Sequence, residues 1–292
     1  MRKILITGSN GNLGRAIFAS GIKVPYTCFF LSKHIISDDS CRPNRCIKAD
    51  ISKDEDIDPK LWGVDEVFHI AGSTHERNPK KYYINNFEAT KRLIDKSEAN
   101  GVKRFIYIST QAIGEKGGAY SHSKELAENY LMQSKLTWTI IRPADIYDTG
   151  NKDSISSLCT LIKTSRLFPI IGDGEYKINP IHIDDFKVFI LRLLECESKK
   201  SHNKIYNLAG PEPVSFKSFC EMRCQDFGKK ILFFYLPVFL CKWFFSFASL
   251  IRISNIVPDQ IDRLIMEKDH CIELASKDYQ FMPRKFTYLN KF

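Results

Sequence analysis

The chain has 292 residues, of which 43% are hydrophobic and 26% charged. This composition is typical of a folded globular protein and excludes a disordered chain, and the length suffices for one large domain or two smaller ones. Lysine and arginine outnumber aspartate and glutamate by 43 to 34, a net charge of +9. Because the basic residues are scattered, they indicate a solvated surface suited to anionic ligands and argue against a nucleic-acid site.

Short β-rich apolar runs alternate with longer amphipathic stretches up to about residue 142. The candidate strands are KILIT, YTCFFL, RCIKA, EVFHI, RFIYIS and WTIIR, and helices are expected near 12–20, 81–99 and 120–135. This alternation predicts an α/β fold of Rossmann type, a doubly wound parallel sheet with helices on both faces.

A glycine-rich turn, TGSNGNLG, follows the first predicted strand and precedes a predicted helix. Glycines in this context make a tight turn and let the backbone approach a pyrophosphate at a helix N-terminus. We therefore expect a dinucleotide here. The candidate cofactor-binding residues of the turn are Gly8, Asn10, Gly11, Asn12, Leu13 and Gly14.

The end of the second predicted strand indicates which dinucleotide binds. An acidic side chain there would hold the ribose hydroxyl of NAD, but this chain has Ser32 and Lys33, and a cation suits the 2′-phosphate of NADP. NADP is therefore favoured over NAD. Asp38 and Asp39 keep NAD open, because a longer strand would bring one of them to the ribose.

Tyr120 and Lys124 are spaced to share one face of the third predicted helix. Such pairs are common on helix surfaces, so the spacing alone does not indicate chemistry. If a nucleotide lies at the carboxyl edge of the sheet, however, the helix that carries the pair lies against it. A tyrosine titrates near pH 10, and we expect the Lys124 ammonium to lower the Tyr120 pKa.

Beyond Pro143 the prolines and glycines become frequent, which suits a smaller lobe. We expect a dinucleotide-binding domain over 1–142, with elements of 175–215 returning to it, and a mainly substrate-binding lobe over 143–292. The apolar segment 231–251 contains Pro237 and Lys242, which disfavour a membrane span. Two short packed helices are expected instead, with peripheral membrane contact as an alternative.

The nine cysteines are an odd number, and the N-terminal residues resemble a strand rather than a secretory leader. Reduced thiols and a cytoplasmic location are therefore expected. Cys220 and Cys224 have helix-face spacing but no second pair of ligands, so we predict no metal site.

Several motifs together resemble the extended short-chain dehydrogenases of the NAD-dependent epimerase/dehydratase family. The resemblance covers residues 1 to about 220. The motifs are TGSNGNLG, Asp50-Ile51, GVDEVFHIAG, NFEAT, GVKRFIYIST, YSHSK, RPADIY, IGDGE, IHIDD and YNLAGPEPVS, in that order.

The resemblance implies roles for individual residues. Tyr120 exchanges a proton with the substrate oxygen while hydride moves to or from the nicotinamide, and Lys124 holds the nicotinamide ribose. A hydroxyl at the end of the fifth strand binds the substrate oxygen; Thr110 is favoured and Ser109 stays open. The further cofactor-binding residues implied are Asp50 and Ile51 at the adenine, Ala71 and Gly72 beside the cofactor, Asn86 ordering the active-site helix, and Pro143 beside the nicotinamide. His69 is expected to be a packed strand residue.

Departures from the family pattern narrow the reaction. Dehydratases have an acidic pair after the catalytic threonine, whereas Gln111 and Ala112 follow Thr110 here. We therefore expect either reduction of a 4-keto sugar nucleotide or C4 epimerisation, with Arg166 and Lys177 as candidate phosphate partners and a homodimer formed through helices 81–99 and 120–135. The alternatives are an NADPH-dependent reductase of an apolar ketone and a non-catalytic NADP sensor or scaffold.

Overall fold

A computed structural model describes residues 2–18, 26–32, 46–53, 63–148, 153–195, 199–243 and 259–286. Its main feature is a parallel seven-stranded sheet in the order β11-β6-β5-β4-β1-β2-β3. The strands are β1 (Arg2–Thr7), β2 (Tyr26–Ser32), β3 (Cys46–Lys48), β4 (Glu66–His69), β5 (Arg104–Ile108), β6 (Thr137–Pro143) and β11 (Lys204–Leu208). All strands run the same way, so their carboxyl ends meet at one edge, where ligands bind in folds of this kind.

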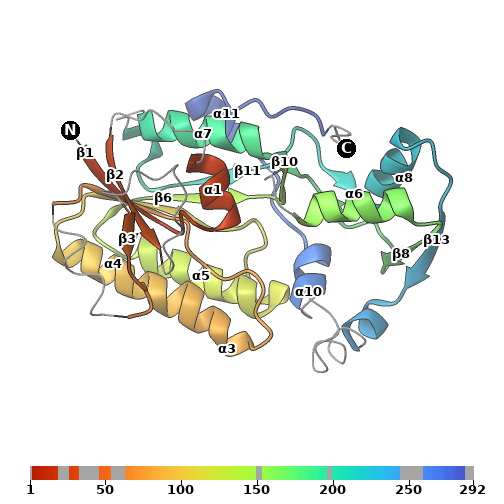
Figure 1. The fold of residues 1–292 in the computed structure, drawn as a ribbon, viewed down its shortest axis with the longest axis horizontal. Helices are drawn as coiled ribbons and strands as arrows, with labels where there is room; N and C mark the ends of the chain where they lie inside the picture. The colour runs from red at the N-terminus through yellow and green to blue at the C-terminus, as the bar shows by residue number, and fades with distance from the viewer. Residues whose placement is uncertain are drawn as a thin grey trace.

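Helices cover both faces of the sheet, as Figure 1 shows. One face carries α1 (Asn12–Phe18), α7 (Ile183–Glu195) and α11 (Glu273–Tyr279); the other carries α3 (Pro79–Tyr82), the π-helix η3 (Tyr83–Glu88), α4 (Ala89–Ala99) and α5 (Gly118–Met132). Strand β1 illustrates why both layers form, because Ile4 and Ile6 enter one core and Leu5 enters the other. The predicted Rossmann-type fold is confirmed.

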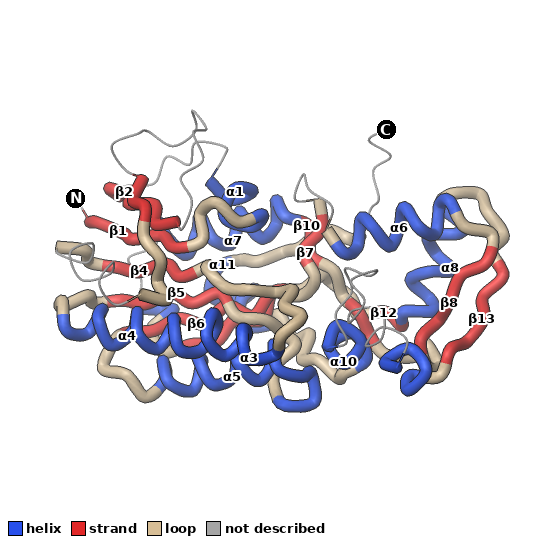
Figure 2. Tube along the Cα trace, turned by 60° about the horizontal axis from the view of Figure 1, so that its bottom comes forward, coloured by secondary structure: helices blue, strands red, loops and turns tan. Residues whose placement is uncertain are grey.

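The second lobe lies beyond the carboxyl edge of the sheet (Figures 1 and 2). Its helices are α6 (Ser154–Thr164) and α8 (Phe216–Asp226), and the short helix α10 (Asp259–Ile265) lies between this lobe and α5. Its strands pair in twos: β7 (Ile146–Tyr147) with β10 (Ile181–His182), β9 (Lys177–Ile178) with β12 (Val214–Ser215), and β8 (Leu167–Ile171) with β13 (Leu232–Leu236). Short 3-10 helices, η4 (Glu115–Gly117) and η5 (Lys199–Ser201), complete the described elements.

The chain crosses between the two lobes more than once. Strand β11 adds a seventh strand to the main sheet beside β6, and α7 and α11 pack on that sheet although both lie beyond residue 143. Residue 142 therefore marks where the predicted dinucleotide-binding motifs give way to others along the sequence. A domain boundary at that residue remains a proposal.

The start of the apolar segment 231–251 is a strand, so the prediction of two packed helices is wrong there. β13 pairs in parallel with β8, and residues 238–243 then form a helix; residues 244–251 lie outside the described ranges. The strand forms because the aromatic residues find backbone partners in β8, and Phe233 packs against Phe168. In the described part of the chain, no helix has the length and apolar character needed to cross a membrane.

Candidate active site

The glycine turn follows β1 at the carboxyl edge of the sheet. Gly8 has φ of +74°, and a Cβ there would lie 2.5 Å from the Ala71 backbone nitrogen, so the turn packs directly against the loop after β4. A Cβ on Gly14 would lie 2.6 Å from the Ser9 Cα. The Gly11 amide donates to the Gly8 carbonyl at 3.0 Å, which closes the turn ahead of α1. These positions accept only glycine, as the sequence motif requires.

His69 fixes the loop beside this turn. One ring nitrogen hydrogen-bonds to the Thr7 hydroxyl at 2.6 Å and the other to the Thr90 hydroxyl at 2.8 Å, so the ring links β1, β4 and α4. Complete burial, reinforced by Lys124, lowers the pKa of His69 to about 3. The ring is therefore neutral, and His69 is a packed strand residue, as expected. The Ala71 amide donates to Thr7, which continues the link toward the turn.

Asn86 connects the loop after β4 to the helix of Tyr120. It lies in the π-helix η3 and is 1% exposed. Its side-chain oxygen accepts from the Ser73 amide at 2.7 Å, and its side-chain nitrogen donates to the Ser73 carbonyl and to the Ser123 hydroxyl of α5. π-helical turns are frequent at functional sites, because they redirect a side chain out of the regular helix pattern.

Lys124 lies beside the same loop but does not hydrogen-bond to Tyr120. Its ammonium donates to the Ile108 carbonyl at 2.8 Å and lies 4.5 Å from the Tyr107 ring centroid. A Cβ on Gly72 would lie 3.1 Å from the Asn86 side-chain oxygen and 3.6 Å from the Lys124 nitrogen, so the loop after β4 passes close to both side chains. Burial lowers the pKa of Lys124 to about 8.

Tyr120 is 7% exposed and meets the end of β5. Burial raises its pKa, and the Arg263 charge and the nearby Thr110 hydroxyl partly counteract this rise. The expectation that Lys124 lowers the Tyr120 pKa is therefore wrong for this structure, because Lys124 points to Ile108 and Arg263 is the cation beside the phenol. The Ser109 hydroxyl is buried and has no hydrogen-bond partner among the described residues.

The other predicted cofactor residues occupy the same edge of the sheet. The Asp50 carboxylate accepts from the Ser52 amide and hydroxyl just beyond β3, and Ile51 packs on the core between the sheet and α4. The Pro143 carbonyl at the end of β6 accepts from the Gln111 amide at 3.1 Å. Ser32 ends β2, and Lys33 lies outside the described residues.

The predicted substrate residues lie in the second lobe. Arg166 is exposed just before β8. Strand β8 lies at the end of the molecule away from α5, the helix of Tyr120 (Figure 1). Lys177 is exposed in β9. Sequence analysis did not single out Arg263 or His270; both follow the motif region, and no local spacing indicates their contacts.

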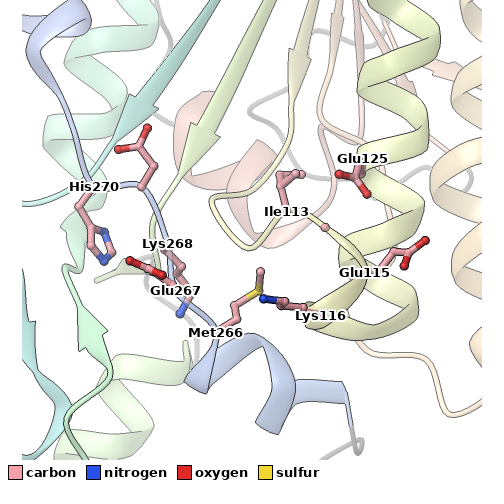
Figure 3. A pocket seen from close by; sticks show the side chains of 10 residues that line it. Ile113, Glu115, Lys116, Glu125, Met266, Glu267, Lys268 and His270 are labelled. Carbon is pink, nitrogen blue, oxygen red and sulfur yellow. The ribbon is translucent and has the colours of Figure 1, made fainter.

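A cavity of about 990 Å³ opens beside η4 and the segment that follows α10 (Figure 3). None of the predicted catalytic residues lines it. The lining residues are Ile113, Gly114, Glu115, Lys116, Glu125, Met266, Glu267, Lys268, Asp269 and His270. His270 also hydrogen-bonds through its Nδ1 to the Gln111 side chain at 3.0 Å, which ties the cavity wall to the residue after Thr110. Carboxylates outnumber lysines in this lining, so sugar hydroxyls suit it better than a diphosphate.

The residues at the carboxyl edge fit a dinucleotide. The glycines of the turn carry no side chains that would block a pyrophosphate, and the buried Ser9 hydroxyl in the turn has no hydrogen-bond partner within the described residues. Gly8 of the turn lies against Ala71, and the next residue, Gly72, lies beside the Asn86 and Lys124 side chains. A continuous path of backbone and polar groups therefore runs from the turn to the helix that carries Tyr120.

Comparisons with known proteins agree with this geometry. The family model described as NAD(P)H-binding matches residues 8–158. A 3β-hydroxysteroid-dehydrogenase/decarboxylase, isoform 2, of Arabidopsis thaliana is 24% identical over 236 residues, which cover 70% of this chain and 42% of the relative, less than half its length. UDP-glucose 4-epimerase of Vibrio cholerae is 24% identical over 241 residues, covering 73% of this chain and 72% of the relative.

A solved structure shares the fold. UDP-glucuronic acid 4-epimerase from Bacillus cereus, in complex with UDP-glucuronic acid and NAD, superposes with a TM-score of 0.71 at 20% sequence identity. The superposition covers 97% of this chain and 95% of that one. The second lobe is therefore part of the shared architecture together with the sheet.

Proposed function

The chain belongs to the NAD(P)H-binding family, and from this premise we propose that it transforms a nucleotide sugar. Its extended short-chain dehydrogenase motifs predicted this membership and an NAD(P) cofactor, and both predictions are confirmed. The enzyme is an oxidoreductase of the NAD-dependent epimerase/dehydratase type. Within that class, the proposed reaction is reduction of a 4-keto sugar nucleotide or C4 epimerisation.

One observation carries the proposal: the phenol of Tyr120 lies beside the Thr110 hydroxyl at the end of β5, next to the path that leads from the glycine turn. A hydroxyl pair of this kind binds a carbonyl or alcohol oxygen from two sides. Ser109 adds a third buried hydroxyl at the same strand end. The arrangement suits proton exchange at a single substrate oxygen.

The proposed roles follow from these positions. The nicotinamide, when bound, supplies or accepts the hydride. The glycine turn binds the pyrophosphate, and Asn86 and Lys124 position the ribose end beside Gly72. Thr110 donates to the substrate oxygen, and Tyr120 gives or takes its proton. Gln111 and Ala112 offer no carboxylate directly after Thr110, where dehydratases have an acidic pair, so elimination of water is not part of the proposal.

The remaining predictions belong to the same proposal. NADP is favoured over NAD through Lys33, and the excess of basic residues suits a diphosphate substrate. A homodimer through α4 and α5, a cytoplasmic location, and phosphate contacts from Arg166 and Lys177 in the substrate lobe also remain predictions.

A substrate panel tests the proposal. The protein is incubated with NADPH and either keto-sugar nucleotides or small apolar ketones, and in parallel with NAD⁺ or NADP⁺ and nucleotide sugars that carry a C4 hydroxyl. NADPH consumption and sugar products are measured. Oxidation of NADPH with a keto-sugar nucleotide, or isomerisation of the sugar without net cofactor loss, supports the proposal. If no sugar nucleotide reacts although NADPH binds, the nucleotide-sugar assignment is wrong, and a sensor or scaffold fits if apolar ketones do not react either.

Tyr120→Phe tests the assigned acid/base group. Loss of the phenolic proton should reduce turnover by about 10²–10⁴-fold while NADPH binding stays unchanged. Tyr130→Phe is the matched control, because Tyr130 lies on the same helix and its hydroxyl bonds Asp95 on the surface of α4. Full turnover by the Tyr120→Phe protein would refute the role.

Reduction of an apolar ketone is the second candidate, and a specific observation favours it. Apolar side chains are exposed along β13 and the helix after it: Leu232, Phe239 and Trp243 are each exposed by about 70%. An apolar substrate, or a membrane that delivers one, would match this surface. The Arabidopsis relative is named for a steroid reaction. Reaction with apolar ketones and not with sugar nucleotides would favour this candidate.

A further inference from the structure

Helix α10 packs over the start of the helix that carries Tyr120. It contacts η4 and α5 (Figure 1), and two glycines make the approach possible. Gly118 has φ of +78°, and a Cβ there would lie 2.9 Å from the Asp259 Cβ; a Cβ on Gly117 would lie 2.7 Å from the Met266 sulfur. Residues far along the chain thereby reach the proposed catalytic group.

Arg263 of α10 lies on the face of the Tyr120 ring. Its guanidinium carbon is 4.4 Å from the ring centroid, within the range of a cation–π contact. Its Nη1 donates to the Thr74 carbonyl at 3.2 Å, and its Nη2 lies 3.6 Å from the Asp259 carboxylate. The Tyr82 ring also meets Tyr120 in a T-shaped contact, with 5.7 Å between the ring centroids. The Tyr120 ring is therefore held by contacts with a cation and with a second aromatic ring.

The charged groups around the phenol act in both directions. Burial raises the Tyr120 pKa most, Arg263 and then Thr110 lower it, and Asp145 and Asp259 raise it. Lys124, on the same helix as Tyr120, is instead bonded to the Ile108 carbonyl. Arg263 is therefore the nearest source of positive charge that acts on the phenol.

We propose that Arg263 is a positioning residue that clamps the Tyr120 ring and favours its phenolate form, a task that the sequence pattern assigns to Lys124. The proposal rests on the proposed function, in which Tyr120 is the acid/base group. Asp259 moderates the effect, because its carboxylate pairs with the guanidinium. A residue of α10, which lies beyond the region that resembles the family, thereby favours ionisation of Tyr120 in the motif YSHSK.

Titration of the phenol tests the proposal without any substrate. Ultraviolet absorbance is followed against pH for each protein and for the same protein with Tyr120→Phe, and the difference gives the ionisation of Tyr120 alone. Arg263→Gln keeps a donor for the Thr74 carbonyl but removes the charge, so the midpoint should rise by about one pH unit. Arg263→Lys keeps the charge and should shift the midpoint less.

Two further variants control the result. Asp259→Asn removes the opposing carboxylate and should move the midpoint downward, which supplies a test of opposite sign if Arg263→Gln does not fold. Arg223→Gln is the matched control, because Arg223 stacks 4.6 Å from the Phe286 ring in the second lobe; it should leave the midpoint unchanged. Circular dichroism at each pH confirms that the proteins remain folded.

The outcomes separate this proposal from the proposed function. An unmoved midpoint in the folded Arg263→Gln and Asp259→Asn proteins overturns the role of Arg263, even if the enzyme is active. A shifted midpoint supports it, even if no sugar nucleotide reacts. Where a substrate is found, the pH profile of kcat should move in the same direction as the titration, whereas a merely structural role would lower kcat without moving that profile.

Discussion

The His69 ring behind the glycine turn and the buried polar groups around Tyr120 differ in how fully they are hydrogen-bonded. His69 uses both ring nitrogens, bonded to Thr7 and Thr90. Around Tyr120, by contrast, the Ser109 hydroxyl, the Gln111 side-chain nitrogen and the Arg263 Nη2 have no hydrogen-bond partner in the described parts of the chain. Each unpaired buried group costs about 1–3 kcal/mol. The first region is therefore a scaffold, and the second has hydrogen-bonding capacity left for a ligand.

The scaffold role of His69 predicts the largest effect, through pH. Its pKa is lowered from 6.5 to about 3, so between these values the unfolded chain binds a proton there and the folded protein does not. The stabilisation is complete above the unfolded pKa and is lost as pH falls toward the folded one, by roughly 5 kcal/mol in all. Urea denaturation from neutral pH to about pH 4 should show this loss in the wild type.

His69→Gln isolates the contribution. The variant should be less stable than the wild type at neutral pH, because Gln cannot bond both threonines and loses the stack on Tyr107. Since the amide does not titrate, the difference should shrink as the pH falls. His122→Gln, on the partly exposed face of α5, is the control. A difference that stays constant with pH would show that His69 is not the group that titrates.

Substitution of the two candidate hydroxyls at the end of β5, Thr110 and Ser109, should have a smaller effect, on kcat. It tests whether the groups around Tyr120 bind the substrate. Thr110 lies beside the phenol and is the proposed donor to the substrate oxygen, so Thr110→Val should reduce kcat by about 10²–10³-fold, as loss of one oxyanion donor does. Ser109→Ala removes only an unpaired hydroxyl and should change kcat less than about fivefold. Steady-state kinetics with the reacting substrate measures both. A larger loss from Ser109→Ala would reverse the assignment.

Local patterns predicted the sheet, and they supplied most residues of the candidate site. Alternating apolar runs identified the strands β1 to β6, and the spacing of the glycines identified the turn, because both depend on neighbours in sequence. Asn86 was found through its motif, and the structure places it between Ser73 and Ser123. These features need no knowledge of the distant chain.

Contacts between segments that are far apart in the sequence were not predicted. The run LFFYL has the composition of a packed helix as well as of a strand, and only the partner strand β8 decides between them. The i,i+4 spacing places Lys124 and Tyr120 on one helix face, but it cannot show that the ammonium turns to the Ile108 carbonyl. Nor can any local pattern bring Arg263 to the phenol.

Lys124 gives the smallest of the predicted effects. It lies on the helix of Tyr120, and like the other polar groups of that region it is buried. Its pKa is lowered from 10.5 to about 8, so its contribution to stability is complete only above the unfolded pKa and is lost as pH falls through the folded one. Lys124→Met removes the buried charge but leaves the Ile108 carbonyl without its donor, so the free energy of unfolding near neutral pH should rise by about 1 kcal/mol. Thermal melts should show the gain, and it should vanish near pH 10. Lys103→Met, at a lysine whose side chain is 80% exposed, should give no gain in stability. If Lys124→Met instead lowers the free energy of unfolding and Lys103→Met does not, the buried Lys124 ammonium stabilises the fold, and the prediction is wrong.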